Sequence, residues 1–348
     1  MMAAIGSTRG RPDGRAITVD MLPIPQPPPS GSQARFAPGF GPRFLVTVET
    51  EEEYDWDRPP VREGHGLDHL PRLAKFQDFC EARQLVPLYL VDWPVATSSL
   101  AADILKPALA AGRAEIGLQL HPWVNPPHDE ELSIANSFAG NLPRDLEAAK
   151  IRNLRDMVEE TFGVAPLVYR AGRYGAGPHT GELLREQGLA IDTSVRPNFD
   201  FSALGGPNFQ RHPLAPYWLD AERTVLELPL TAVFWGMLRR QGPALLSALR
   251  RVPKAFAQFG LLDRIALTPE GVSGEEAIRA IDIALDDGLP LLVFSFHSPS
   301  LRPDHTPFVR SDRDLDAFYE WWRRVLDYCA GRGVRPTTVG EIMRAVER

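Results

Sequence analysis

The sequence has few cysteines and no long apolar run. Its two cysteines, Cys80 and Cys329, lie in segments with helical patterns. Two distant cysteines form neither a disulfide framework nor a metal site on their own, so we expect buried, unreactive thiols. No apolar run of about 18 residues is present, which excludes a membrane-spanning helix. Residues 1–20 also lack the continuous apolar region of a secretory signal, and we expect a cytoplasmic protein.

The chain also lacks a basic excess. Its 348 residues include 38 Lys and Arg against 45 Asp and Glu, which gives a net charge of -7. A protein that binds nucleic acid needs a basic face to replace phosphate counterions, so the charge argues against that class. Hydrophobic residues at 44% and charged residues at 24% are typical of a globular protein. Composition leaves the oligomeric state open.

The N-terminal segment differs in composition from the rest of the chain. Residues 1–40 are rich in Gly, Pro, Arg and Ser, and they include the run PIPQPPPSGS. Such a segment buries too little apolar surface to offset its ordering entropy, so we expect a flexible tail. A polyproline ligand is the alternative interpretation of the run. We expect residues 41–348 to form a single domain.

A regular alternation of strand and helix patterns begins at residue 41. The strand-like runs are 43–50, 85–93, 114–121, 167–172, 189–195, 225–235 and 290–298. The helical patterns are 67–83, 99–112, 143–162, 178–187, 244–258, 274–287 and 312–331. Val, Ile and Leu on both faces of the strands favour parallel strands covered by helices. The alternation predicts βα units closed into a barrel or laid out as an open sheet. The irregular stretch 196–222 is interpreted as a long active-site loop.

Reactive polar residues stand at the ends of several strand patterns. Glu49 and Glu51 end the first strand, and their i, i+2 spacing puts them on one face, where one acid can bind a cation and the other can act as a base. The acids that follow, Glu52, Glu53 and Asp55, are interpreted as a solvated run at a loop start.

The third strand pattern ends directly in His121, and Pro122 then stops the strand because proline has no N–H for the sheet. Gln119 points to the same side and can orient a substrate or His121. Trp123 offers a flat surface for a sugar. A hydrogen-bonded structural histidine and a core tryptophan are the alternatives for these two residues.

The later strands end in the same way. The fourth exits through Arg170 and then Arg173 and Tyr174, with neighbouring glycines that suit close approach to a ligand. A surface loop with salt-bridging arginines is the alternative. The fifth ends at Asp192, where an Asx turn competes with a functional role. The last ends in His297, again followed by a proline within two residues. In a parallel sheet these ends lie on one rim, which favours a shared site.

This ordered set resembles the polysaccharide deacetylase superfamily, of the NodB-homology or carbohydrate esterase family 4 type, and within it the divergent WalW-like branch. The resemblance covers roughly residues 43–345, including the segment HTPFVRSDRDLDAFYEWW. It implies an α/β fold, a distorted (β/α) barrel with about seven parallel strands. It also implies hydrolysis of an N-acetyl group, or of another C–N bond, on a sugar-like substrate.

The resemblance also implies roles for individual residues. The general base falls on Glu49 and the metal-binding acid on Glu51, while the histidine pair of the second motif falls on Gln119 and His121. The arginine that holds the base matches Arg170, and Tyr174 supplies a backbone N–H for the oxyanion. The general acid falls on His297, oriented by Asp192. Trp123 and Arg173 are expected to contact substrate.

Two departures from the family pattern affect the chemistry. Glu49 replaces an aspartate, and Gln119 replaces a histidine ligand. Catalytic zinc normally has three protein ligands and a water, and Glu51 and His121 are only two. The sequence therefore predicts a hydrolase that removes an N-acyl group from a sugar or polysaccharide precursor, with a divalent metal, zinc first, or without one. A catalytically degenerate relative that binds carbohydrate in polysaccharide biosynthesis is the alternative.

Overall fold

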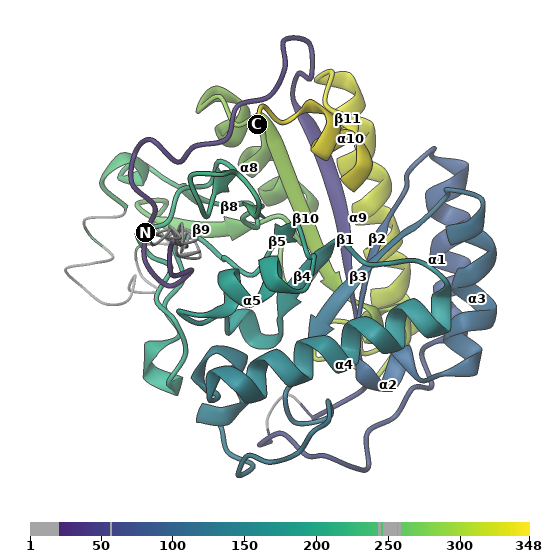
Figure 1. The fold of residues 1–348 in the computed structure, drawn as a ribbon. Coiled ribbons are helices and arrows are strands. Elements are labelled where there is room, and N and C mark those ends of the chain that lie inside the picture. The colour runs from purple at the N-terminus through teal and green to yellow at the C-terminus, as the bar shows by residue number, and fades with distance from the viewer. Residues whose placement is uncertain (1–20, 56–57, 243–244, 246–255, 257–258) are drawn as a thin grey trace, which may run out of the picture.

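The fold is built around one curled, mostly parallel β-sheet (Figure 1). The structure is a computed structural model that describes residues 21–55, 58–242, 245, 256 and 259–348. Seven parallel strands lie in the order β10, β1, β2, β3, β4, β5 and β7, with antiparallel β6 at the end and β11 beside β1. Their bounds are β1 Arg43–Thr50, β2 Leu88–Val91, β3 Glu115–Leu120, β4 Val168–Ala171, β5 Ile191–Asp192, β6 Tyr217–Trp218, β7 Leu226–Glu227, β10 Leu291–His297 and β11 Arg335–Pro336. The predicted distorted barrel with about seven parallel strands is confirmed.

The two ends of this sheet meet through irregular backbone. The Thr231 N–H, beyond β7, donates to the Val293 carbonyl of β10 at 3.3 Å. The Leu267 N–H donates to the Thr231 carbonyl at 3.0 Å, and the Ser295 N–H donates to the Leu267 carbonyl at 3.2 Å. A separate antiparallel ribbon flanks this junction, with β8 Ala232–Trp235 and β9 Asp263–Ala266. Isolated hydrogen bonds thus close the barrel at a place where a regular barrel has a pair of strands. The barrel is therefore distorted.

Helices surround the sheet, most of them on its outer face. They are α1 Pro71–Ala82, α2 Trp93–Ala96, α3 Ser99–Ala110, α4 Arg144–Phe162, α5 Thr180–Glu186, α8 Gly274–Asp286, α9 Asp312–Gly331 and α10 Val339–Ala345. In Figure 1, α4 crosses the lower front, and α1, α3 and α9 lie on the right. Ser273 and Glu276 form a capping box at the start of α8, and Ser311 caps α9, so local sequence fixes these two boundaries. None of the helices in the described part of the chain is long and apolar enough to cross a membrane.

Apolar side chains form two layers because successive residues of a strand face opposite sides of the sheet. The inner group includes Leu45, Leu90, Val168 and Val293, and it fills the end of the barrel at which the parallel strands begin. The larger outer group lies between the sheet and the helices, and it includes the aromatic residues Phe76, Phe294, Phe296 and Trp322. The inner layer leaves the opposite end of the barrel to polar side chains.

The structure corrects the expected flexible tail for residues 21–40. Ile24 is fully buried in the outer layer, and Ala34 and Phe40 pack in the inner one. Isolated β-bridges join Gln33 to Tyr217 and Phe36 to Val346. The prolines lower the conformational entropy that this segment loses on ordering, so a few apolar anchors and bridges suffice to hold it. Residues 1–20 lie outside the described residues.

Other differences concern short elements. The expected strand 225–235 is two strands, β7 and β8, separated by the closing segment around Thr231. The ribbon strand β9, the short β11 and α10 have too little periodic pattern to be seen in the sequence. Most of the expected helix 244–258 lies outside the described residues. Cys80 and Cys329 are free and buried, as expected, and burial raises the pKa of Cys329 to about 12.

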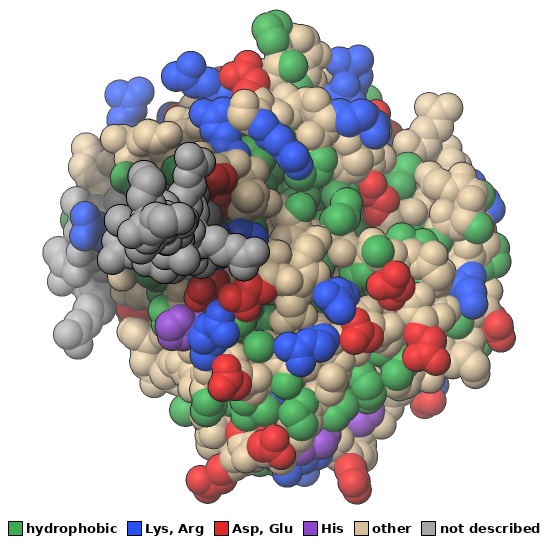
Figure 2. Space-filling view, in the orientation of Figure 1, with side chains coloured by type: hydrophobic (Ala, Val, Ile, Leu, Met, Phe, Trp, Pro, Cys, Tyr) green, Lys and Arg blue, Asp and Glu red, His purple; other side chains and the backbone are tan. Residues whose placement is uncertain are grey.

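The surface agrees with the modest net charge. Figure 2 shows basic side chains gathered mainly along the upper part of the face that it draws and acidic side chains mainly lower down, so both signs are present on this face. A continuous basic face is what nucleic-acid binding requires. The absence of a nucleic-acid partner stays a prediction.

Candidate active site

The strand ends β1, β3, β4 and β10 border a cavity of about 620 Å³. Its floor is polar and consists of Glu49, Glu51, Gln119, His121 and His297. Its walls are mostly aromatic or apolar: Tyr54, Pro59, Pro60, Trp123, Ile134, Phe138, Tyr174, Phe201 and Leu204. Three arginines complete the lining: Arg58, Arg173 and Arg196. The predicted loop 196–222 therefore contributes to the cavity.

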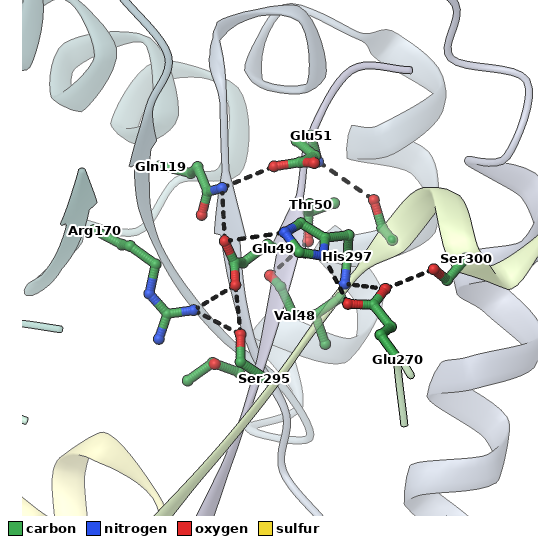
Figure 3. A network of polar contacts seen from close by, with 12 residues as sticks. Val48, Glu49, Thr50, Glu51, Gln119, Arg170, Glu270, Ser295, His297 and Ser300 are labelled. Carbon is green, nitrogen blue, oxygen red and sulfur yellow. Dashed lines mark hydrogen bonds and ion pairs between the residues drawn. The ribbon is translucent and has the colours of Figure 1, made fainter. Parts of the chain in front are cut away.

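Glu49 lies at the centre of the polar floor (Figure 3). Its Oε1 accepts hydrogen bonds from Arg170 Nη1 at 3.1 Å and from Ser295 Oγ at 2.5 Å. Its Oε2 faces Gln119 Nε2 at 3.2 Å and His297 Nε2 at 3.6 Å. Burial alone would raise the pKa of Glu49, but His297 and Arg170 lower it to about 2. Glu49 is therefore an ionised carboxylate at neutral pH.

His297 is held by Glu270, a residue that sequence reasoning missed. Glu270 Oε2 lies 2.7 Å from His297 Nδ1, and its Oε1 accepts the His297 backbone N–H at 3.1 Å and the Ser300 hydroxyl at 2.6 Å. Burial alone would lower the pKa of His297, but Glu270 and Glu49 raise it to about 10. At neutral pH the imidazole is protonated, with Nε2 directed towards Glu49 (Figure 3).

Asp192 is not the residue that orients His297, because it faces the other side of the sheet. Asp192 pairs in register with Tyr169, so the next row holds Arg170 and Thr193. Side chains alternate along a strand, which puts Asp192 and Arg170 on opposite faces. The carbonyl and hydroxyl oxygens of Thr193 accept hydrogen bonds from Arg170 at 2.9 and 3.1 Å. The expected Asp192–His297 contact is thus replaced by the one from Glu270.

The acids behind the sheet form a separate group. Asp192 accepts a hydrogen bond from Ser194 Oγ at 2.6 Å and lies against the Glu227 carboxyl group. Burial raises the pKa of Asp192, and burial together with Asp192 raises that of Glu227 well above its ordinary value. Glu147 of α4 lies near this pair, and burial raises its pKa to about 7. Burial thus favours the protonated form of each of these three carboxyl groups.

Gln119 bridges the two acids of the floor. Its Nε2 donates to Glu51 Oε2 at 2.8 Å and to Glu49 Oε2 at 3.2 Å (Figure 3). Glu51 Oε2 also lies 3.3 Å from His121 Nε2. Burial raises the pKa of Glu51. An amide donor therefore stands between the carboxylates, at the position where the family resemblance implied a metal ligand.

His121 is clamped between carboxylates. Glu52 Oε2 lies 2.7 Å from its Nδ1, on the side opposite Glu51. The Trp123 ring stacks on His121 with centroids 4.3 Å apart, and its Nε1 donates to Glu52 at 2.6 Å. Burial alone would lower the pKa of His121, but Glu52 and Glu51 raise it well above its ordinary value. The bound imidazolium fixes one wall of the cavity.

The expected solvated acidic run is wrong for Glu52. Its side chain is buried, and its backbone N–H donates to Asp92 Oδ2 at 2.7 Å. Glu53 is partly buried against His69, whose Nδ1 lies 2.8 Å from Glu53 Oε1. Asp55 is exposed, as expected. Consecutive acids face different surroundings here because the chain has left the sheet after Thr50, so that Glu52 contacts Asp92 and Glu53 contacts His69.

The turn after β4 brings two further predicted residues to the cavity. Arg173 and Tyr174 both have positive φ, 55° and 60°, a region that non-glycine residues rarely adopt. Such conformations cost about 1–3 kcal/mol each and persist where surrounding contacts hold them. Gly172 lets this turn approach His121, because a Cβ at Gly172 would lie 2.3 Å from His121 Cδ2. Both Arg173 and Tyr174 line the cavity.

Among the described residues, two groups have donors spaced to hold a metal ion. In the first, ligand atoms of Glu49, Glu51 and His297 lie within 4.8 Å of one another. Glu51 Oε1 and Gln119 Oε1 are buried there without a hydrogen-bond partner, as an open coordination position would require. The Glu49 and Glu51 carboxylates and the Gln119 amide oxygen are oxygen donors that suit a divalent cation, whereas His297, protonated at neutral pH, has no lone pair to offer.

The second group, made of Glu52, Asp92 and His121, meets the same spacing criterion. Its close contacts are already made within the protein, since His121 Nδ1 and Trp123 Nε1 both lie against Glu52. A histidine protonated by its neighbours has no lone pair for a metal. We assign this group to the support of His121.

Glu270 and Tyr54, two site residues that sequence reasoning missed, lie outside the strands. Glu270 follows β9 in an irregular connection, and Tyr54 lies in the loop after β1. Tyr54 contacts both His121 and Trp123, each with ring centroids 6.0 Å apart. The sequence offers one weak signal for Glu270, because this residue follows Pro269 shortly after the strand β9.

Comparisons with known proteins find similar structures but no similar sequence. No family model and no curated protein matches the sequence. The structure is similar to that of a 4-alpha-glucanotransferase from Thermococcus litoralis, with a TM-score of 0.51 and 13% identity over 87% of this chain and 40% of that one. It is also similar to a chitin deacetylase from Colletotrichum lindemuthianum, with a TM-score of 0.44 and 11% identity over 92% of both chains. A family 4 carbohydrate esterase from Streptomyces lividans gives a TM-score of 0.41 and 10% identity over 86% of this chain and 93% of that one. At these identities the likeness concerns the fold alone.

Proposed function

We propose that this protein hydrolyses the N-acyl amide, an acetamide first, of a sugar or polysaccharide precursor. The observation that carries the proposal is the facing pair Glu49 and His297, 3.6 Å apart, on the floor of a cavity with aromatic walls. Each member has a buried partner of opposite charge behind it, Arg170 and Glu270. One residue is thereby kept ionised and the other protonated, as a base and an acid require.

The proton transfers follow from these two states. A water molecule attacks the carbonyl carbon of the amide and forms the new C–O bond, while Glu49 takes a proton from this water. The C–N bond then breaks as His297 gives its Nε2 proton to the leaving amine. The Tyr174 backbone N–H is proposed to stabilise the oxyanion. The products are a carboxylic acid and a free amino sugar, and the two proton transfers balance.

A divalent cation would strengthen this scheme. With a pKa of about 2, Glu49 is a weak base, so the water and the carbonyl need further activation. Glu51 and, after rotation of its amide, Gln119 would hold the cation, which supplies a Lewis acid that polarises the carbonyl oxygen. Zinc is the metal that the family resemblance implies. Oxygen donors also suit magnesium or manganese, so the identity of the metal is part of the test.

The second candidate is a carbohydrate-binding protein without catalysis. It is favoured by one specific observation, that Gln119 donates to both floor carboxylates and stands where a cation would lie. The aromatic walls would then supply the stacking surfaces that hold a sugar.

Acetate release separates the two candidates. The purified full chain is analysed for bound metals and incubated with a panel of N-acetylated oligosaccharides, with and without chelator. Release that falls with chelator and returns with zinc or manganese supports the metal-assisted hydrolase. Release that survives chelation supports hydrolysis by the protein residues alone. No release across the panel, with sugar binding retained, favours the binding protein.

A further inference from the structure

Two arginines of the cavity have no role in the proposed acid–base chemistry. Arg173 reaches it from the turn after β4, and Arg196 from the loop after β5. Within the described part of the chain, neither guanidinium has a carboxylate within 4.0 Å. Arg196 Nε is moreover buried without a hydrogen-bond partner.

Aromatic rings hold these arginines in place. The Arg173 guanidinium lies 4.6 Å from the centroid of Phe138, and its Nη1 donates to Ser137 Oγ at 2.5 Å. The Arg196 guanidinium lies 5.0 Å from the Tyr174 centroid and 4.2 Å from that of Phe199. Stacking fixes the plane of a guanidinium but leaves its charge uncompensated.

The charge of the floor does not require these two cations. Glu49 is balanced by Arg170, and Glu270 by His297. Half-buried guanidinium groups are costly to keep without an anion, and burial lowers the pKa of Arg173. The missing partner is therefore an anion that comes from outside the described chain, and the cavity that both arginines line is where it would bind.

We infer that the substrate carries an oxyanion, a carboxylate or a phosphate group, and that Arg173 and Arg196 bind it while the N-acyl group lies over Glu49 and His297. The inference rests on the proposed function for the sugar and acyl parts of the ligand. What it adds is the class of substrate, which is an acidic N-acylated sugar, either a sugar acid or a glycosyl phosphate. The planar guanidinium matches both groups through paired N–H donors.

Calorimetric titration of the full chain tests the inference with three matched probes. They are N-acetylglucosamine, its 1-phosphate and the corresponding N-acetylated uronic acid. The account predicts that at least one anionic probe binds about tenfold or more tightly than the neutral sugar, with an advantage that shrinks as salt is added. The tighter of the two anionic probes identifies the source of the charge. Equal binding of the three probes, or binding of none, overturns the inference.

Variants assign the effect to the two arginines. Arg173→Gln and Arg196→Gln should each remove most of the preference for the anionic probe, measured as the ratio of the dissociation constants of the neutral and anionic probes. Arg196→Lys keeps the positive charge but loses the paired N–H donors of the guanidinium group, so it should retain part of the preference for the anionic probe. Arg83→Gln is the control, because Arg83 also stacks on a ring, Phe79, at 5.3 Å but does not line the cavity.

The outcomes separate this inference from the proposed function. If the glutamine variants weaken neutral and anionic probes equally, the arginines are structural and the inference fails, whatever the activity. If anionic preference is present and depends on the arginines but no acyl group is released, the inference stands and the hydrolase proposal fails.

Discussion

Glu49 on the inner face of the sheet and the pair Asp192 and Glu227 on its outer face are buried carboxyl groups whose pKa values are shifted in opposite directions. On the inner face, Glu49 contacts Arg170 and His297, which hold its pKa at about 2 against the effect of burial. On the outer face, Asp192 and Glu227 lie against each other, and burial raises the pKa of both. Both sets stand at strand ends. The difference shows that a strand-end acid becomes a candidate base only where a cation is built in beside it.

The register of strand pairing explains why the two sets of carboxyl groups face opposite sides of the sheet. Tyr169, Asp192 and Glu227 share one row across β4, β5 and β7. Gln119 and Arg170 share the next row across β3 and β4. A shift of one residue along a strand exchanges the faces, so adjacent residues such as Asp192 and Thr193 have unrelated surroundings.

Removal of the inner cation should have the largest effect. Arg170→Met leaves Glu49 buried without its guanidinium, and we expect a loss of about 3–5 kcal/mol in the free energy of unfolding, measured by urea denaturation. The partly exposed pair Arg43–Glu341 is the matched control, and Arg43→Met should cost less than about 1 kcal/mol. The double variant Glu49→Gln with Arg170→Met should recover part of the loss. Equal costs at the two sites would contradict the comparison.

The outer acids should make stability depend on pH in one direction. Glu147 has a pKa of about 7 in the folded protein, above the value of 4.5 for an unperturbed glutamate, so the folded state binds the proton more tightly. Its contribution to stability is complete below pH 4.5 and is lost as the pH rises through 7. Glu147→Gln cannot ionise and therefore does not lose stability in this way. As the pH rises, its free energy of unfolding should exceed that of the wild type by an increasing amount, up to about 3 kcal/mol. A margin that stays constant between pH 5 and 9 would show that Glu147 is ionised in the folded protein.

Glu270 should matter for activity more than for folding. Glu270→Gln removes the charge that holds His297 protonated and aligned, and we expect kcat to fall by about 100-fold, with KM nearly unchanged, because the lost function is proton transfer. Initial rates of acetate release measure both constants. A loss confined to KM would assign Glu270 to binding and remove His297 from the proposed role of acid.

The smallest effect is expected at Asp192. Asp192→Asn keeps an acceptor for Ser194 and lies behind the sheet, so kcat should fall by less than about threefold. The same rate assay gives the comparison with Glu270→Gln. A loss as large as that of the Glu270 variant would restore Asp192 to the catalytic set and contradict the separation of the two faces.

The sequence was sufficient for the elements with strong periodic patterns. The parallel strands and their order along the chain follow from long Val- and Leu-rich runs, and the strand ends identify Glu49, His121, Arg170 and His297. These side chains converge because parallel strands end at one rim. The short strand β5 was the exception, since two residues give no pattern from which to read which face Asp192 takes.

The remaining site residues depend on tertiary contacts that no local pattern encodes. Glu270 reaches His297 only because the irregular segment after β9 returns to β10. Glu52 is buried because Asp92, 40 residues away along the chain, accepts its backbone N–H. Residues 21–40 have the composition of a tail, yet Ile24 and Phe40 find apolar surfaces on the finished barrel.

The most direct test of the central claim is acetate release by the wild type and by Glu49→Gln on the N-acetylated substrate that binds best. If Glu49 and His297 form the acid–base pair, the wild type releases acetate and the variant is slower by about 1,000-fold, with sugar binding within about threefold of the wild type. Glu320→Gln, a change in an exposed ion pair, should leave the rate unchanged. A Glu49→Gln protein that releases acetate at the wild-type rate, or a wild type that binds the sugar and releases none, would contradict the account.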